Sequence, residues 1–117
     1  MAELRVVRHT THFMEGCRFY GETLGWPVTK QWDEPNAGRI FGYGDTARVE
    51  LIDNDTDEEV AGVSLAIEVA DATHVNATMQ IHAVEITQDL ADQPWGHRNF
   101  SVLDPTGMTV TFFQVIV

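Results

Sequence analysis

The sequence predicts an α+β fold in which two βαβββ modules form a curved mixed sheet. Three observations lead to this prediction: short apolar segments that alternate like strands, two segments with helical character, and the same order of elements in both halves of the 117 residues. We place the modules at about 1–55 and 62–117, within a single domain spanning residues 1–117. Because neither half is expected to close a core alone, we expect one continuous sheet with the helices outside and a concave face inside.

The first half begins with a strand and a helix. Residues 4–10 have an apolar strand pattern, and apolar side chains then recur every three or four positions over residues 13–24. Gly25 and Pro27 end this helix, because Gly accepts the left-handed conformation and Pro cannot continue helical hydrogen bonding. The acidic run 53–59 reads as a solvated linker. Before it, three strands are predicted at residues 28–32, 39–43 and 47–52.

The second half repeats this order of elements. Strict alternation of apolar and polar residues predicts a strand over 63–69. Asp71 is suited to cap a short helix over 72–79, although several β-branched residues lower the helix propensity of this segment. A further strand follows over 84–90.

A β-hairpin over residues 94–114 closes the sequence. The segment 104–107, Asp-Pro-Thr-Gly, has the turn-forming residues that a short hairpin loop needs. On the second strand, Thr109, Thr111 and Phe113 share a semi-polar face. We expect the functional side chains on this face.

Composition limits the kinds of partner. The chain carries 18 acidic and 7 basic residues, a net charge of −11. This charge disfavours nucleic acid as a partner and favours cationic ligands. The simpler explanation is that the acidic residues only keep the protein soluble. No apolar run reaches the roughly 18 residues of a membrane helix, and the N-terminus lacks a signal-peptide pattern. Cys17 is the only cysteine, so no internal disulfide can form. We therefore expect a cytoplasmic protein that binds neither membrane nor nucleic acid.

Four motifs carry a family resemblance. They are Arg18–Trp26 (RFYGETLGW), Val49–Ile52 (VELI), Asp92–Arg98 (DQPWGHR) and Asp104–Gly107 (DPTG). In combination they resemble the vicinal oxygen chelate superfamily, in particular its glyoxalase/bleomycin resistance protein/dioxygenase branch, over nearly the whole chain. The resemblance implies the glyoxalase/bleomycin resistance fold, with a small molecule held in a cavity at the sheet. The implied partners are thus a small-molecule ligand and a second copy of the chain in a homodimer.

Enzymes of that superfamily hold a divalent metal on four strand positions. The resemblance places these positions at Arg5, Glu50, Ser64 and Thr111. A guanidinium stays protonated and has no lone pair to donate, and hydroxyls are weak donors, so only Glu50 suits a metal. We therefore expect no metal site and no cofactor. We also expect Arg5 to pair with Glu50 on the floor of the cavity.

Aromatic residues on or beside the predicted strands indicate a wall for an aromatic or cationic ligand. We assign Trp26 to the core, whereas Trp32 and Trp95 suit the core and the rim of the cavity equally. His9 and His12 have a spacing found in metal pairs, but we interpret them as polar rim residues. The candidate ligand-binding residues are Arg5, His9, Trp32, Phe41, Glu50, Ser64, Trp95, His97, Thr111 and Phe113.

Two functional classes are compatible with these features. In the first, which we favour, the protein sequesters a small cationic or aromatic molecule without changing it, as the resemblance to antibiotic-resistance proteins implies. In the second it is a lyase, isomerase or dioxygenase that uses an atypical metal site or acid–base chemistry by Glu50 and His97. Stoichiometric transition metal in the purified protein would favour the second class.

Overall fold

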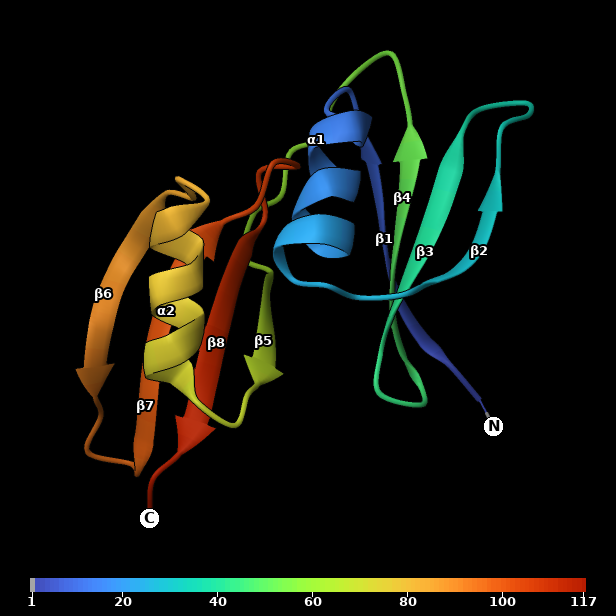
Figure 1. The fold of residues 1–117 in the computed structure, drawn as a ribbon. Coiled ribbons are helices and arrows are strands. Elements are labelled where there is room, and N and C mark those ends of the chain that lie inside the picture. The colour runs from blue at the N-terminus through green and yellow to red at the C-terminus, as the bar shows by residue number, and fades with distance from the viewer. Residues whose placement is uncertain (1) are drawn as a thin grey trace. The chain divides into compact units, whose positions relative to one another are not determined.

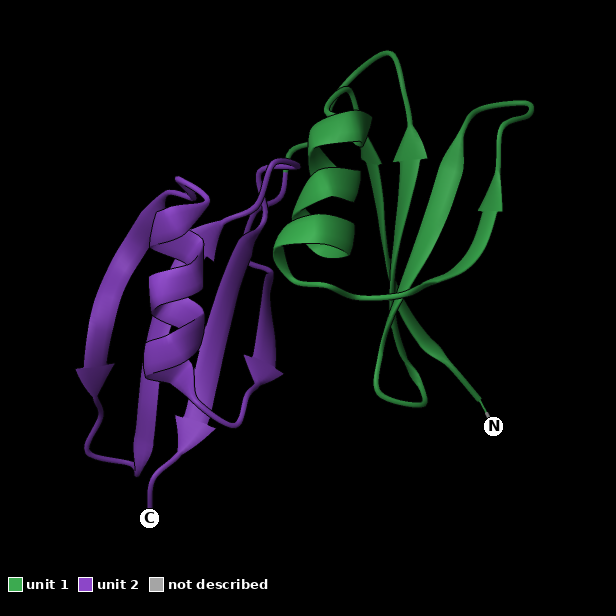
Figure 2. Ribbon diagram, in the orientation of Figure 1, with its two compact units in different colours: residues 1–59 green, residues 60–117 purple. Residues whose placement is uncertain are grey.

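The chain forms two compact units, residues 1–59 and 60–117 (Figure 2). The computed structural model describes residues 2–117. Each unit contains four strands and one helical segment in the predicted order, strand, helix and three strands. Within the described residues, no helix is long and apolar enough to cross a membrane.

In the first unit a helical segment covers one face of a four-stranded sheet, sheet A (Figure 1). The strands lie in the order β1-β4-β3-β2, with β1 parallel to β4 and the other neighbours antiparallel. Gly25 lies just beyond the helical segment with a positive φ of 73°, as its predicted role requires. The elements are β1 (Leu4–Thr10), α1 (Phe13–Arg18), the π-helical segment η1 (Phe19–Thr23), β2 (Val28–Trp32), β3 (Gly38–Tyr43) and β4 (Ala47–Asp53).

The second unit repeats this arrangement with sheet B, in the order β5-β8-β7-β6. The Asp71 carboxylate accepts a hydrogen bond from the backbone N–H of His74 at 3.0 Å, which is the predicted N-cap. This cap supports a segment of low helix propensity, and the helix extends two residues beyond the predicted end. The elements are β5 (Ser64–Glu68), α2 (Ala72–Ile81), β6 (Ile86–Asp92), β7 (His97–Leu103) and β8 (Thr109–Val115).

Hydrogen bonding joins the strands into two sheets of four, where one continuous sheet was expected. The reason is that each half places an apolar layer between its own helix and its own sheet. In the second unit this layer contains Phe100 and Phe112, which are buried and stacked with ring centroids 5.3 Å apart. We call the face of each sheet that points away from its own helix the distal face.

The register of sheet A corrects one candidate ligand-binding residue. Phe41 lies opposite Val49 on the helix side of the sheet, whereas its neighbour Ile40 lies opposite Glu50 on the distal side. Phe41 is only 2% exposed, and its ring centroid lies 6.0 Å from that of Tyr20. It is therefore a core residue, not part of a ligand wall.

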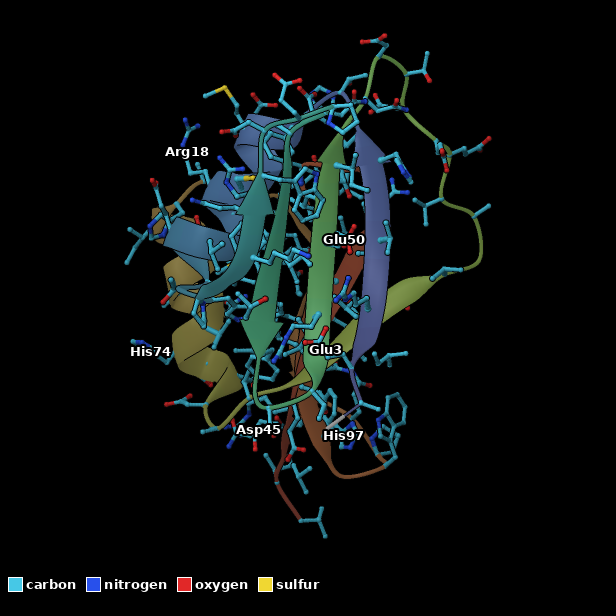
Figure 3. All side chains as sticks on the ribbon, turned by 90° about the vertical axis from the view of Figure 1, so that its right-hand side faces the viewer. Glu3, Arg18, Asp45, Glu50, His74 and His97 are labelled. Atoms are coloured by element: carbon cyan, nitrogen blue, oxygen red, sulfur yellow. The ribbon has the colours of Figure 1, made fainter. Side chains whose placement is uncertain are left out.

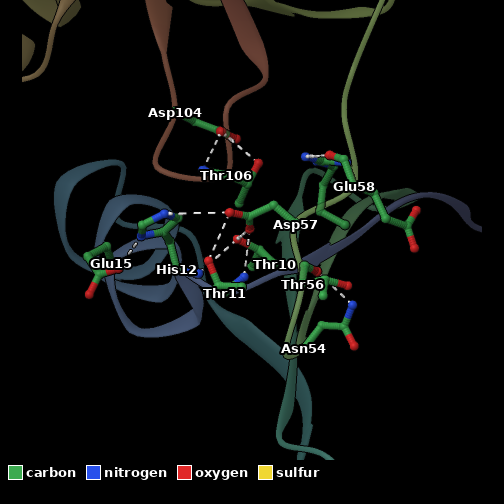
Figure 4. Close-up of polar contacts among 11 residues, drawn as sticks. Thr10, Thr11, His12, Glu15, Asn54, Thr56, Asp57, Glu58, Asp104 and Thr106 are labelled. Atoms are coloured by element: carbon green, nitrogen blue, oxygen red, sulfur yellow. Dashed lines mark hydrogen bonds and ion pairs between the residues drawn. The ribbon is translucent and has the colours of Figure 1, made fainter.

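The two predicted connections between strands behave differently. In the hairpin turn after β7, Gly107 has a φ of 88° and its N–H donates to the carbonyl of Asp104 at 3.0 Å, as the Asp-Pro-Thr-Gly turn predicts. The acidic run 53–59 is exposed except at the half-buried Asn54, as predicted for a solvated linker, but it is held at one point. The carboxylate of Asp57 binds the turn between β1 and α1 (Figure 4). The linker is thus anchored to the first unit.

Candidate ligand-binding faces

Strand register decides which candidate residues share a face of sheet A. Val7 lies opposite Glu50, and Glu50 lies opposite Ile40, so these three side chains point to the distal face. Arg5 is two residues before Val7 in the same strand and points to the same side. Figure 3 looks onto this face, which carries the labelled side chains of Glu3 and Glu50.

Arg5 contacts Glu50, as the sequence predicts. Arg5 Nη1 lies 3.2 Å from Glu50 Oε1, and Arg5 Nε donates to Glu3 Oε1 at 3.0 Å. Arg48 Nε lies 3.3 Å from the other carboxylate oxygen of Glu3. The four side chains alternate in sign, so the guanidinium groups balance the carboxylates. The distal face of sheet A therefore presents no uncompensated charge at Glu50.

The ion pairs also fix the protonation states of two of these groups. The hydrogen bond from Arg5 lowers the pKa of Glu3, and the positive charges of Arg5 and Arg48 add to this effect. The hydrogen bond to Glu3 raises the pKa of Arg5, and the bond to Glu50 adds to it. Glu3 and Arg5 are therefore both ionised near neutral pH.

Trp32 supplies an aromatic surface on the same face. It lies opposite Gly38 on β3, and a Cβ built on Gly38 would come within 2.2 Å of Trp32 Cζ2. The indole ring thus lies against the glycine backbone and fills the space that a side chain would need. Because Trp32 is half-buried, part of its ring remains accessible to a ligand.

The distal face of sheet B carries a network of uncharged polar groups. Ser101 Oγ lies 2.7 Å from Thr111 Oγ1 and donates to Gln88 Oε1 at 3.2 Å. The Nε2 groups of Gln88 and Gln93 both donate to Asn99 Oδ1, at 3.5 and 3.0 Å. The network runs from β8 across β7 to β6 and to Gln93, the residue that follows β6. We call Gln88, Gln93, Asn99, Ser101 and Thr111 the polar ladder.

His97 and Phe113 form an aromatic pair beside the polar ladder. Their ring centroids are 4.7 Å apart and their planes are inclined by 18°. Phe113 lies directly opposite Asn99 in the register, and His97 precedes Asn99 by two residues, so all three point to the distal face. Aromatic and hydrogen-bonding groups are therefore adjacent on sheet B.

The remaining candidates lie at the margins of the two faces. Ser64 lies opposite Thr109 and points to the distal face of sheet B. His9 Nδ1, at the end of β1, lies 3.8 Å from Glu58 Oε1. Trp95 lies in the turn between β6 and β7 and is 64% exposed, so it is not a core residue. Among the candidates, Arg5 contacts Glu50 on sheet A, and His97 contacts Phe113 on sheet B. Trp32 shares the distal face of sheet A but lies on β2, at the opposite edge of the sheet from Arg5 on β1. Ser64 and Thr111 share the distal face of sheet B.

Sequence comparison now gives the family. The sequence model of the Glyoxalase/Bleomycin resistance protein/Dioxygenase superfamily matches residues 5–112. The chain belongs to this superfamily. The resemblance carried by the four sequence motifs is confirmed. A search of curated proteins finds no significant match.

Solved structures show the same fold at low sequence identity. TioX from Micromonospora sp. ML1 has a TM-score of 0.79 at 16% identity, over 97% of this chain and 98% of its own. Lactoylglutathione lyase from Agrobacterium tumefaciens has a TM-score of 0.74 at 13% identity, over 95% of this chain and 91% of its own. A glyoxalase I mutant from Zea mays reaches 0.83 at 17% identity, over 98% of this chain and 48% of its own. At these identities the similarity establishes the fold alone.

The metal site implied for the superfamily's enzymes does not fit the residues of this chain. Arg5 places a guanidinium group 3.2 Å from Glu50 Oε1, where it would repel a cation bound by that carboxylate. Ser64 and Thr111 offer only neutral hydroxyls, and that of Thr111 is hydrogen-bonded to Ser101. Among residues 2–117, no group of three or more His, Cys, Asp or Glu side chains is placed to hold a metal ion.

Sequence reasoning missed most of the polar ladder, although part of it had a signal. Asn99 and Ser101 alternate with the buried Phe100 and Val102 in β7, so the period of two already placed them on the face that carries Thr111. The two glutamines had no such signal. Register shifts interrupt the pairing of β6 with β7, so simple alternation does not predict which side chains of β6 reach the ladder.

Proposed function

We propose that this protein binds aromatic small molecules, on the distal face of sheet A and on that of sheet B, and sequesters them without chemical change. The observation that carries the proposal is the ion pair of Arg5 and Glu50, with Nη1 3.2 Å from Oε1. It puts a fixed positive charge at a position to which the family resemblance assigns a metal ligand. The Glu50 side chain is only 12% exposed, so little of its carboxylate is left for a second partner.

The aromatic surfaces support this proposal. Trp32 on sheet A, and Phe113 with His97 on sheet B, offer ring faces or edges on the distal side. Stacking on such rings needs no catalytic group and contributes about 0.5–1.5 kcal/mol per ring pair beyond the buried area. The charge balance at Glu3 and Glu50 favours an aromatic over a cationic ligand, because both carboxylates already have guanidinium partners.

Acid–base catalysis by Glu50 and His97 has less support. Within its own unit each side chain is already engaged, Glu50 by Arg5 and His97 by the ring of Phe113. A general base must be free to reach the proton that it abstracts. These contacts therefore support an enzymatic function less than they support ligand sequestration.

Two measurements test the proposal. Protein purified without chelator and then incubated with Zn²⁺, Ni²⁺ or Fe²⁺ should retain no stoichiometric metal after desalting; stoichiometric metal would favour the enzyme. Quinoline, an uncharged aromatic probe, should quench tryptophan fluorescence in a saturable manner. The saturable component should disappear in Trp32→Leu and persist in the matched variant Trp95→Leu. Equal loss in both variants would contradict a site at Trp32.

We further propose that the protein is a homodimer. Each sheet ends in two edge strands, β1 and β2 in sheet A and β5 and β6 in sheet B, whose backbone groups can pair with another chain. The apolar side chains of Leu4, Val7 and Val28 on two of these strands are exposed. Light scattering should therefore give twice the chain mass of 13.1 kDa. A mass equal to that of one chain would refute the dimer.

A further inference from the structure

We propose that the polar ladder on the distal face of sheet B recognises an uncharged aryl carboxamide, that is, an amide group attached directly to an aromatic ring. This inference rests on the proposed function, because it names the class of aromatic molecule that the face binds. Three features carry it: the direction of the hydrogen bonds in the ladder, a donor without an internal partner, and the ring of Phe113 beside both.

The direction of the hydrogen bonds leaves an acceptor at one end of the ladder. Ser101 has one hydroxyl proton and donates it to Gln88 Oε1. In the contact of 2.7 Å between Ser101 and Thr111, the proton must therefore come from Thr111. The Thr111 oxygen then has no proton left and offers only a lone pair to a ligand.

The other end of the ladder leaves a donor. Asn99 Oδ1 accepts hydrogen bonds from both Gln88 and Gln93, which uses both of its lone pairs. Within residues 2–117, no hydrogen bond involves Asn99 Nδ2, although the residue is only 7% exposed. Among the described residues, only Arg48 Nε is a fully buried side-chain polar atom without a hydrogen-bond partner. Asn99 Nδ2 also has no such partner, so it is not fully buried and solvent reaches it. Asn99 thus presents an N–H₂ group that is already oriented.

The spacing of these two groups suits one amide. Asn99 lies opposite Phe113 in the register, so Thr111 is its diagonal neighbour. Diagonal neighbours across an antiparallel pair are roughly 7–8 Å apart. An amide whose carbonyl accepts from Asn99 Nδ2 and whose N–H donates to Thr111 Oγ1, each over about 2.9 Å, spans a gap of this order. The attached aromatic ring would then lie against Phe113.

The ladder also selects against charge. A carboxylate would place its oxygens against the lone pair of Thr111, and an amidinium would place its N–H groups against the N–H₂ of Asn99. Transfer of an ion from water to a site where one of its groups has no hydrogen-bond partner costs free energy. The carboxylate next in register, Glu68, lies opposite Phe113 on β5 and already has an interaction of its own. An uncharged amide is the form that satisfies both ends.

Three small molecules of the same shape test the inference: benzamide, benzoate and benzamidinium. We would titrate the full chain with each and follow the side-chain N–H₂ signals of asparagine and glutamine by NMR. Benzamide should shift the Asn99 signal and bind at least about tenfold more tightly than either ion, a difference of about 1.4 kcal/mol. Equal affinity for the three probes, a preference for an ion, or no shift at Asn99 would each overturn the inference.

Matched variants locate the interaction on the ladder. Asn99→Asp keeps an oxygen for Gln88 and Gln93 but removes the free donor, so benzamide affinity should fall about tenfold and benzamidinium should become the preferred probe. Gln80→Glu, on the exposed surface of α2, makes the same change of amide to acid and should leave benzamide binding unchanged. If Asn99→Asp and Gln80→Glu behave alike, the effect is one of net charge and the inference fails.

The acceptor is tested separately. Thr111→Val should weaken benzamide binding and Thr111→Ser should restore it, because serine returns the hydroxyl; failure of Thr111→Ser to restore binding would contradict this role. The outcomes are also distinguishable from those of the proposed function. Metal content and quinoline quenching at Trp32 test that function, whereas the Asn99 signal in the NMR titration reports on the ladder of sheet B.

Discussion

Asp57 binds Thr11 through both of its carboxylate oxygens. Oδ1 accepts from the backbone N–H of Thr11 at 2.8 Å, and Oδ2 accepts from its hydroxyl at 2.9 Å (Figure 4). Thr10 adds a longer hydrogen bond of 3.4 Å to Oδ1, and His12 Nε2 lies 3.8 Å from Oδ2. Residues 53–59 are thereby attached to the segment that begins α1.

We expect this contact to make the free energy of unfolding depend on pH in the acidic range. The backbone N–H of Thr11, followed by its hydroxyl, lowers the pKa of Asp57. A carboxylate with a lowered pKa in the folded state stabilises that state above its unfolded pKa, about 3.9, and this stabilisation is lost as the pH falls through the folded pKa. Urea unfolding should therefore show a steeper loss below about pH 4 in the wild type than in Asp57→Asn. Asp55→Asn, in the same loop, should keep the wild-type profile, and equal profiles for all three would contradict the prediction.

Replacing Arg5 by His should create affinity for a divalent metal. A neutral imidazole has the lone pair that a guanidinium lacks, and it would stand beside the Glu50 carboxylate after removal of the repelling charge. Calorimetric titration with Ni²⁺ should give at least about tenfold tighter binding for Arg5→His than for the wild type. Arg5→Lys retains the positive charge and should not gain affinity. The interpretation of Arg5 as the obstacle fails if Arg5→His binds no better than Arg5→Lys.

Gly38→Ala should displace Trp32 from the distal face of sheet A. The new Cβ would lie 2.2 Å from Trp32 Cζ2, so the ring must move, at a cost of about 1–3 kcal/mol. Tryptophan emission should shift to longer wavelength and saturable quinoline quenching should weaken. Gly44→Ala is the matched control: it strains a residue with a φ of 65° but meets no atom within 4 Å, so it should lower stability without changing the emission. Unchanged emission in Gly38→Ala would show that Trp32 does not rest on this glycine.

Asp104→Ala should destabilise the hairpin that carries the polar ladder. Asp104 Oδ1 accepts from the N–H and hydroxyl of Thr106 and from the N–H of Met108, at 2.8, 2.7 and 3.0 Å. All three residues are buried, and alanine removes the acceptor of these three hydrogen bonds, which should cost about 2–4 kcal/mol in urea unfolding. Asp104→Asn keeps the accepting oxygen and should lose less than half of that. Equal losses for the two variants would indicate that the charge, and not the acceptor, stabilises the turn.

Local sequence patterns predicted the helices, strands and turns well, because the formation of these elements depends largely on residues that are neighbours in sequence. Alternation predicted β5, the Asp-Pro-Thr-Gly segment predicted the turn at Gly107, and Asp71 predicted the start of α2. The same patterns could not assign Phe41 to a face. That assignment depends on which residue of β4 lies opposite it, a contact between segments that alternation alone does not give.

The sequence by itself determined the family, the order of the elements and the lack of a suitable donor at Arg5, because motifs and ionisation chemistry are properties of residue types. Only the tertiary structure decided that Arg5 meets Glu50, that Trp32 lies on Gly38, and that Asn99 and Thr111 end one network with opposite hydrogen-bonding capacity. These relationships join strands that are distant in sequence. They follow from pairing register and side-chain geometry, which no single segment of the chain contains.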